Sequence, residues 1–324
     1  MRNILLVITV LLFSSSVDAQ IKWNNPSSKK SEVPLITPED SNLEFVRRDI
    51  IFKKVKRHRS SVAGEDGAMT VKGFPGFEKE IIHRFQTIHG ECANNDWDCR
   101  PENVETYHTR SEVSHPSEYR DFATIGDTTT LSYEVYIAKN PTVAHLAVYD
   151  DWFNLGQLHG SGDEDVPISI AVANYDKRHK IVDENGKLTS RTLQPGSLAL
   201  YLRSIVFKQG YRNHSFKSAV VLAEKGEYEN RWIRIDMEIH WQQDETGKLL
   251  VKMNGKPVFE CTGCVTAPRH PLVGMMDGVK QPIGFNLKWG IYSWRRQGDD
   301  FNRNRDTLPP TVVAYYKNVS WDNR

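Results

Sequence analysis

The chain has 324 residues, with 42 basic and 41 acidic side chains and a formal net charge of +1. A nearly neutral chain has no overall attraction for a polyanion, so nucleic-acid binding is not expected and any acidic partner must be held by local patches. Basic patches of this kind are residues 53–59 and the group Arg295, Arg296, Arg303 and Arg305. Each patch also fits a solvated surface.

Residues 1–19 have the features of a signal peptide. Arg2 gives a basic start, residues 4–13 are apolar, and small residues lead up to Ala19, where a signal peptidase would cut. The apolar run is too short to span a bilayer, and no other segment approaches transmembrane length. We therefore expect a secreted or periplasmic protein whose mature chain begins near Gln20.

Residues 20–67 are polar and rich in Lys, Ser and Pro, which is typical of a linker or leader, with one strand expected around residues 43–52. Residues 68–324 are predicted to form one domain, because all-β domains of this size often remain undivided. We expect the protein to be a monomer.

Many short strands with one buried face are predicted in this domain. Leu131, Tyr133, Val135 and Ile137 alternate with more polar residues, which is the pattern of a half-buried strand. Similar runs occur at residues 168–174, 198–207, 219–223, 232–241, 249–253 and 311–318. Asn254-Gly255 is a strong hairpin turn signal. The pattern predicts an all-β fold, a two-sheet antiparallel β-jelly-roll sandwich.

The four cysteines form two local pairs, Cys92 with Cys99 and Cys261 with Cys264. In an exported protein this spacing favours two short disulfide loops, while a four-thiolate zinc site is the alternative, because Cys-x-x-Cys is a common half-site. No cofactor and no catalytic metal are expected. Residues 162–165, Gly-Asp-Glu-Asp, offer oxygen ligands for a structural calcium ion, and a solvated loop explains them equally well.

The segment at residues 286–292 reads Asn-Leu-Lys-Trp-Gly-Ile-Tyr. In a strand, Lys288 and Tyr292 lie on one face with a glycine between them, and Trp289 and Ile291 lie on the apolar face that belongs in a core. The cation and the phenol are then roughly 13 Å apart, beside a glycine where a ligand can approach the backbone. An exposed Lys and a half-buried Tyr without a function are the plain alternative.

Two other segments carry polar pairs on one strand face. Arg110 and Glu112 project to the same side, and a guanidinium held by a carboxylate is a fixed, forked anion receptor. Gln157 and His159 also share a face and are flanked by glycines. A surface ion pair and a structural histidine are the corresponding alternatives.

These residue types suit the cleavage of a uronic-acid polymer by β-elimination. Gln157 and Arg110 would neutralise the carboxylate next to the C5 proton, since fixed donors aimed at developing charge are usually the largest catalytic term. His159 titrates in the right range for the base. Tyr292 would protonate the leaving O4, or act as the base when geometry demands it. Lys288 would hold a neighbouring anionic group or lower the pKa of the phenol.

The segments Arg-Ser-Glu-Val at position 110, Gln-Leu-His at 157 and Lys-Trp-Gly-Ile-Tyr at 288 resemble the signature segments of the jelly-roll polysaccharide lyases. This group includes the alginate lyases, the glucuronan lyases and the heparin lyase I group, and the resemblance covers residues 77–320. Two segments look most like the heparin lyase I-like branch, namely residues 131–138 leading to 157–159 and residues 232–239 leading to the hairpin at Asn254-Gly255. The resemblance implies the catalytic roles just given. The substrate-binding residues expected alongside them are Glu112, Trp289, Arg295 and Arg296.

The sequence departs from the alginate-type pattern at Trp289, where a small residue is usual, and at the following residues 293–295. The departures leave glucuronan, heparin, heparan sulfate and other uronates open as substrates.

Two rival functions fit parts of the sequence. A jelly-roll glycoside hydrolase needs a pair of carboxylates, and the strand with Asp236 and Glu238 comes close, but Arg234 stands where the nucleophile would be. A polar outer face of a sandwich strand explains this pattern more simply. A non-catalytic, lectin-like module would need exposed aromatic side chains, and the candidates are Trp97, Trp152, Trp289 and Trp294.

Overall fold

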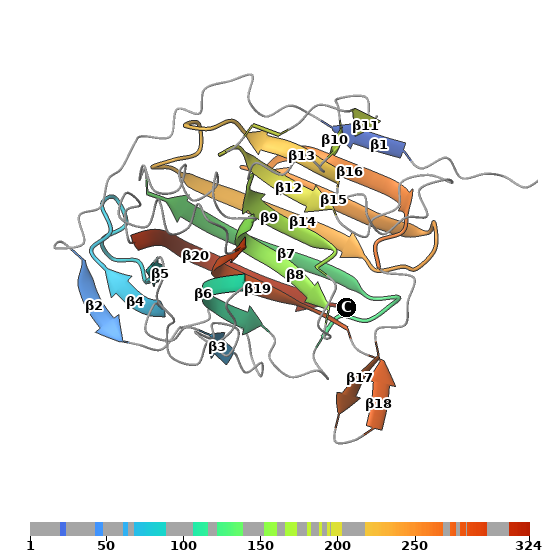
Figure 1. The fold of residues 1–324 in the computed structure, drawn as a ribbon, viewed down its shortest axis with the longest axis horizontal. Coiled ribbons are helices and arrows are strands. Elements are labelled where there is room, and N and C mark those ends of the chain that lie inside the picture. Colours follow the sequence, from blue (N-terminus) through green and yellow to red (C-terminus); the bar gives the residue numbers. More distant parts are fainter. Residues whose placement is uncertain are drawn as a thin grey trace, which may run out of the picture.

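The computed structural model describes residues 20–23, 43–47, 61–63, 68–88, 106–115, 122–138, 152–160, 166–173, 180–182, 188–189, 193–194, 196–202, 218–267, 273–276, 279–282, 284–296 and 311–324. Every regular element in these ranges is a β-strand. Figure 1 shows the strands arranged in two large layers.

The first layer, which we name the β7 sheet, has nine strands. In spatial order they are β1 (Gln20–Trp23), β16 (Lys256–Cys264), β15 (Gly247–Met253), β14 (Trp232–His240), β7 (Thr128–Ile137), β20 (Thr311–Asn323), β5 (Ile82–Ile88), β4 (Ala68–Lys72) and β2 (Glu44–Arg47).

The second layer, the β19 sheet, also has nine strands. In spatial order they are β11 (Leu188–Thr189), β10 (Lys180–Val182), β13 (Ser218–Ala223), β12 (Leu198–Leu202), β9 (Ile168–Val172), β8 (Trp152–Gly160), β19 (Phe285–Arg296), β6 (Thr106–His115) and β3 (Ser61–Ala63). Strands β17 (Val273–Met276) and β18 (Val279–Pro282) form a separate hairpin. Neighbouring strands are antiparallel except for β10 and β13, which are parallel.

The hydrophobic core lies between the two sheets. Leu131, Tyr133, Val135 and Ile137 of β7 are all buried in it, on the face that alternation predicts. Trp241, which follows β14, stacks on Phe285 of β19 with 3.9 Å between ring centroids, and so joins the sheets. The prediction of an all-β, two-sheet antiparallel jelly-roll sandwich is confirmed.

The predicted hairpin at Asn254-Gly255 is also confirmed. It joins β15 to β16, and both turn residues have positive φ angles, 51° and 77°. A two-residue turn with two positive φ angles matches the twist of the flanking strands, and Asn-Gly is the pair that adopts it most readily.

The polar region at residues 20–67 contributes strands to both sheets. β1 pairs with β16 and β2 pairs with β4 in the β7 sheet, while β3 pairs with β6 in the β19 sheet. β2 lies within residues 43–52, where one strand is expected, while β1 and β3 are strands that the polar composition of the region does not indicate. Backbone pairing holds them, and such pairing leaves little trace in side-chain composition. The predicted signal peptide, residues 1–19, lies outside the described residues.

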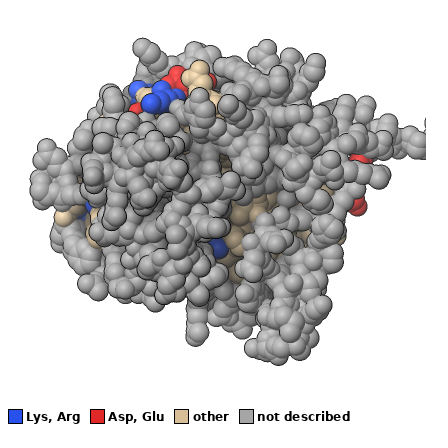
Figure 2. Space-filling model, viewed as in Figure 1, with Lys and Arg blue, Asp and Glu red and all other residues tan. Residues whose placement is uncertain are grey.

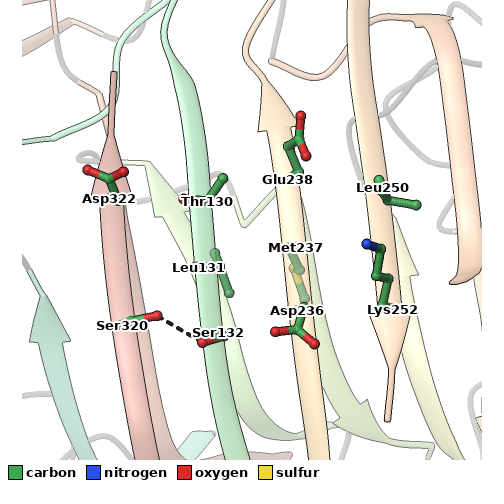
Figure 3. Close-up of a pocket in the computed structure, with 10 residues that line it drawn as sticks. All are labelled: Thr130, Leu131, Ser132, Asp236, Met237, Glu238, Leu250, Lys252, Ser320 and Asp322. Atoms are coloured by element: carbon green, nitrogen blue, oxygen red, sulfur yellow. Dashed lines mark hydrogen bonds between the residues drawn. The ribbon is translucent and has the colours of Figure 1, made fainter. Parts of the chain in front are cut away.

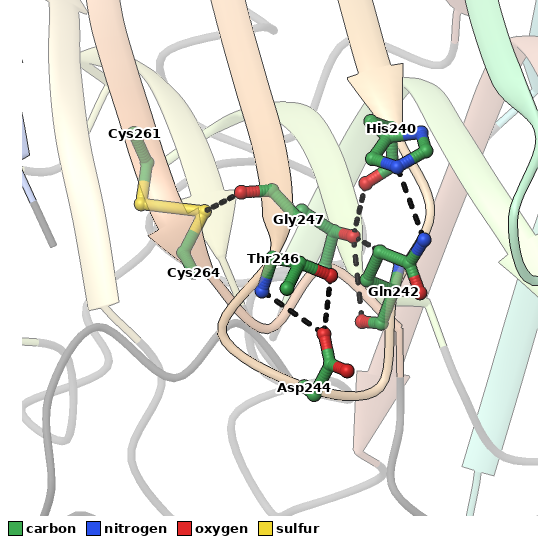
Figure 4. The surroundings of a disulfide bond; sticks show 8 residues. His240, Gln242, Asp244, Thr246, Gly247, Cys261 and Cys264 are labelled. Carbon is green, nitrogen blue, oxygen red and sulfur yellow. Dashed lines mark hydrogen bonds between the residues drawn. A yellow bond between two sulfur atoms is a disulfide. The ribbon is translucent and has the colours of Figure 1, made fainter. Parts of the chain in front are cut away.

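Cys261 and Cys264 of β16 form one of the two predicted disulfides, and both residues are buried in the core (Figure 4). Their sulfur atoms are bonded to each other and so do not serve as the thiolate half-site of a zinc ion. The other predicted pair, Cys92 and Cys99, lies outside the described residues. Within the described ranges, no helix is long and apolar enough to cross a membrane.

Candidate active site

The three segments with polar pairs occupy adjacent strands. β19 lies between β8 and β6 in the β19 sheet, so it separates the strand of Gln157 and His159 from the strand of Arg110 and Glu112. Segments more than 100 residues apart in the sequence therefore meet in one part of one sheet (Figure 1).

The side chains of β19 alternate as predicted between the core and the outer face of the sheet. Leu287, Trp289 and Ile291 are buried in the core. Lys288 and Tyr292 belong to the outer face, where Lys288 is half-buried and Tyr292 is 8% exposed. This outer face therefore carries the cation and the phenol of the candidate site.

The prediction that Trp289 contacts substrate is wrong. Its side chain is 0% exposed and packs edge-on against Phe85, with 5.1 Å between ring centroids, and against His83 at 5.4 Å. Strand alternation turns this indole away from the face that carries Lys288 and Tyr292. Its contribution is therefore to core packing, and it is also excluded as an exposed aromatic of a lectin-like module.

The register aligns the polar residues in rows across the sheet. Tyr292 lies directly between Arg110 of β6 and Asn154 of β8. Residues opposite each other on neighbouring strands have Cβ atoms about 4.5–5.5 Å apart, so these rows bring side chains within reach of one another.

A second row places Lys288 opposite Gln157, and a third places His159 opposite Asn286. The predicted set of Gln157, His159, Lys288 and Tyr292 thus lies on one stretch of the outer face. The backbone of Arg110 lies beside it, but the side chain of Arg110 lies outside the described residues.

A buried chain of hydrogen bonds connects two strands of the site across β19. Gln157 Nε2 donates to Glu112 Oε1 at 3.0 Å, and Asn154 Nδ2 donates to Gln157 Oε1 at 3.3 Å. All three side chains are at most 3% exposed. The sequence predicts that Glu112 holds Arg110 and binds substrate, and the structure adds its hydrogen bond with Gln157.

Asn154 is a site residue that the sequence pattern does not reveal. In a regular strand, residues 154 and 157 would point to opposite faces because they are an odd number apart. The register of β8 shifts between Asn154 and Gly156, and Leu155 is the extra residue of this β-bulge. The bulge turns Asn154 to the same face as Gln157.

The bulged region is held from the other sheet by Tyr316 of β20. The one hydrogen of its Oη is shared between the carbonyl oxygens of Leu155 and Gly290, at 2.7 and 2.8 Å. Bulges leave ladder groups unpaired, and a buried phenol satisfies two of them here. Burial raises the pKa of Tyr316 well above its ordinary value, so the phenol stays protonated and keeps donating.

His159 has a defined tautomer when it is neutral. Its Nδ1 contacts the carbonyl oxygen of Gly160. A carbonyl can only accept, so Nδ1 carries the hydrogen and the lone pair of the neutral ring is on Nε2. The imidazole can then accept a proton at Nε2.

Arg295 and Arg296 lie near the end of β19, where they pair with Tyr107 and Thr106 of β6. This position is on the far side of Tyr292 from Lys288, along the same strand. Their side chains, and the acidic stretch at residues 162–165, lie outside the described residues. In the space-filling view from the same side as Figure 1, the described atoms near the middle of the face are mostly uncharged, with a basic group among them (Figure 2).

The carboxylates of β14 lie on the outer face of the other sheet. Asp236 accepts hydrogen bonds from Arg234 at 2.8 and 2.9 Å, and the strand alternates between buried and more exposed residues along its length. Asp236 and Glu238 also line an open pocket of about 270 Å³. Figure 3 shows its lining, which is Thr130, Leu131, Ser132, Asp236, Met237, Glu238, Leu250, Lys252, Ser320 and Asp322.

The interpretation of this strand as a polar outer face is therefore confirmed, and the ion pair occupies the carboxylate that a glycoside hydrolase would need free. Within the described ranges, no cluster of three or more His, Cys, Asp or Glu side chains is arranged to hold a metal ion.

Comparisons with known proteins identify the family of the chain. A family profile described as "Polysaccharide lyase" matches residues 65–320. No curated protein sequence matches the chain.

Solved structures with a similar fold include three lyases. An endo-β-1,4-glucuronan lyase from the fungus Trichoderma reesei is 14% identical, with 83% of this chain and 88% of that chain covered and a TM-score of 0.41. An alginate lyase from Alteromonas sp. 272 is 10% identical, with 82% and 94% covered and a TM-score of 0.41. The family 7 alginate lyase A1-II′, as a variant with bound substrate, is 11% identical, with 75% and 78% covered and a TM-score of 0.41.

Identities and TM-scores this low identify no function, and the family profile is the finding that identifies the chain. It spans most of the sequence, from just before β4 to within β20, and so includes all three strands of the candidate site. The chain belongs to the polysaccharide lyase family.

Proposed function

We propose that this polysaccharide lyase cleaves a uronic-acid-containing polysaccharide by β-elimination. The observation that carries the proposal is the position of Gln157, His159, Lys288 and Tyr292 on one outer face of two adjacent strands, β8 and β19. These side chains provide an amide donor, an imidazole, a cation and a phenol, which are the groups that proton abstraction next to a carboxylate requires.

In the proposed reaction, Gln157 and Arg110 donate hydrogen bonds to the carboxylate on C5, which stabilises the enolate-like charge that develops there. His159 takes the C5 proton at Nε2. The electron pair of the C5–H bond forms the C4=C5 double bond as the C4–O4 bond breaks. Tyr292 gives its proton to O4 and regains one from solvent, and His159 releases the C5 proton to solvent.

Lys288 of β19 lies opposite Gln157 on one side and pairs with β6 on the other. It would hold the substrate carboxylate or a neighbouring anionic group. Arg295 and Arg296, farther along β19, are proposed to bind the adjoining part of the polymer.

The polymer remains a choice among glucuronan, heparin, heparan sulfate, alginate and other uronates. Trp289, which departs from the alginate-type pattern, is buried in the core and does not contact a sugar. The departure therefore reflects packing, and it gives no reason to favour one polymer over another. A panel of these polymers with hyaluronan and ulvan, followed at the ultraviolet absorbance of the unsaturated product, would identify the substrate.

The test of the mechanism is Tyr292→Phe, which removes one hydroxyl group and keeps the ring. We expect the rate of absorbance growth on the preferred polymer to fall by roughly 10²–10⁴-fold, the usual contribution of a general acid or base, with most of the polymer affinity retained. The control is Tyr136→Phe, on the outer face of the other sheet, where the phenol donates to Asn230 at 3.3 Å. An unchanged rate in Tyr292→Phe would show that another group is the acid.

We also propose that the protein is exported by a signal peptide at residues 1–19 and acts as a monomer. N-terminal sequencing of the mature chain should give a start near Gln20, and light scattering should give the mass of one chain. An intact Met1 on the exported protein would contradict the first expectation, and a dimer mass the second.

A further inference from the structure

We propose that Glu112 and Asn154 are positioning residues that fix the side-chain amide of Gln157 in one orientation, with an N–H directed to the substrate. This inference rests on the proposed function and explains how one of its residues is prepared for the reaction. It concerns two linked hydrogen bonds, in which Asn154 donates to Gln157 and Gln157 donates to Glu112.

The direction follows from the chemistry of the three groups. An ionised carboxylate only accepts hydrogen bonds, so Glu112 must face the amide nitrogen of Gln157. The amide oxygen of Gln157 is then turned to Asn154, which must meet it with its own nitrogen. Rotating Gln157 by half a turn would place its oxygen against the carboxylate and its nitrogen against another nitrogen, so both hydrogen bonds would be lost.

The geometry shows that the network belongs to the site. Gln157 on β8 and Glu112 on β6 are two strands apart, roughly 10 Å between the strand axes, and their side chains meet over β19. The residue of β19 opposite Glu112 is Gly290, which has no side chain to separate them. Asn154 lies opposite Tyr292, so the network begins beside the proposed acid.

Burial makes any other orientation of the Gln157 amide energetically costly. Asn154, Gln157 and Glu112 are 1%, 1% and 3% exposed, and a buried polar group that loses its partner also lacks water to replace it. Asn154 Oδ1 is itself buried without a hydrogen-bond partner among the described residues. Asn154 thus donates from its nitrogen to Gln157 while its own oxygen has no partner among the described residues. This is expected when Glu112 sets the direction of the two hydrogen bonds.

The consequence for catalysis concerns the second hydrogen on Gln157 Nε2. One hydrogen is used by Glu112, and the described part of the chain supplies no acceptor for the other. In the proposed reaction, that second N–H is the one that donates to the substrate carboxylate. Without Glu112 and Asn154, the amide could present its oxygen instead, and an oxygen would repel the anion that it should bind.

The experiment reverses the direction of both hydrogen bonds while keeping the total charge and the size of the three side chains. In the double variant Glu112→Gln with Asn154→Asp, the introduced aspartate accepts from Gln157 Nε2 and the introduced glutamine donates to Gln157 Oε1. We expect kcat to fall at least tenfold, with the midpoint of thermal unfolding close to that of the wild-type protein. The control is Glu238→Gln, which neutralises an exposed carboxylate on the other sheet and should leave kcat unchanged.

A second measurement separates positioning from general damage. If Glu112 and Asn154 act through Gln157, the double variant should have no further effect on kcat once Gln157 is replaced by Ala. Wild-type kcat in the reversed variant, or losses that multiply in the Gln157→Ala background, would overturn the inference. A wild-type protein that cleaves none of the uronate polymers would instead overturn the proposed function and this inference together.

Discussion

Gly290 occupies a position on β19 where a side chain is excluded. Its φ angle is +124°, and a Cβ atom there would meet the carbonyl oxygen of Ser111, with Phe85 at 3.0 Å. The register of β19 against β8 shifts at this point, between Trp289 and Tyr292. The glycine therefore allows the bend that sets Tyr292 opposite Asn154.

Replacing Gly290 by Ala should destabilise the protein by two separate effects. Gly255 provides the matched control, because its φ angle is +77° but nothing lies within 4 Å of its added Cβ. Gly255→Ala should lower the free energy of unfolding by about 1–3 kcal/mol through backbone strain alone, and Gly290→Ala by about 1–3 kcal/mol more through the clash. Urea denaturation measures both. Equal losses in the two variants would show that the space around Gly290 is not limiting.

The residues of the site could be predicted from the sequence only in part. Gln157, His159, Lys288 and Tyr292 stand out because strand alternation assigns each of them to a face, and the structure places them on one face. Asn154 could not be found in this way, because a bulge cancels the alternation. The hydrogen bond from Gln157 to Glu112 depends on the order of strands in the sheet, which no local pattern encodes.

At the scale of the elements, β8 and β7 from opposite sheets are in close contact at Gly156. A Cβ atom at this position would lie 2.6 Å from Oη of Tyr133, whose ring is fully buried in the core. The phenol of Tyr133 is itself without a hydrogen-bond partner among the described residues. The glycine is therefore needed for sheet packing directly beside Gln157.

Gly156→Ala should lower the free energy of unfolding by about 1–3 kcal/mol, the usual cost of overpacking a core. Tyr133→Phe removes the oxygen that the new methyl group would strike, so Gly156→Ala should cost less in that background. The difference is read from a double-mutant cycle by urea denaturation. Additive losses would mean that the methyl group is accommodated by other movements.

The long strands of the sandwich were predictable and the short ones were not. β7, β14 and β15 alternate over seven or more residues, and their faces follow from that pattern. β1 and β3 have four and three residues and lie in a polar region, so their pairing with β16 and β6 depends on the backbone of the partner strand. Short edge strands of this kind become visible only when the whole sheet is present.

At the scale of the whole molecule, several tyrosines are buried between the sheets or beneath turns. Burial raises the pKa of Tyr133, Tyr228 and Tyr316 above the ordinary value of 10.0. In the unfolded chain these phenols ionise near pH 10.0, while in the folded protein they stay neutral. Their contribution to stability is therefore complete below that pH and decreases as the pH rises further.

The free energy of unfolding should fall when the pH is raised from about 8 to about 11, and Tyr316→Phe should make this fall smaller because one ionisation is removed from the unfolded state. Urea denaturation at both pH values gives the slope, and tyrosinate absorbance gives the number of phenols that ionise in the native state. Native titration of all 12 tyrosines near pH 10.0 would contradict the burial of these groups.

The molecule as a whole is a jelly-roll polysaccharide lyase in which β19 joins three sequence segments into one face. The central claim is that this face performs an elimination and not a hydrolysis. Mass spectrometry of the products from one oligosaccharide of defined length tests the claim directly, because elimination adds no water. We predict that the masses of the two fragments sum to the mass of the substrate, and a sum larger by one water molecule would contradict the account.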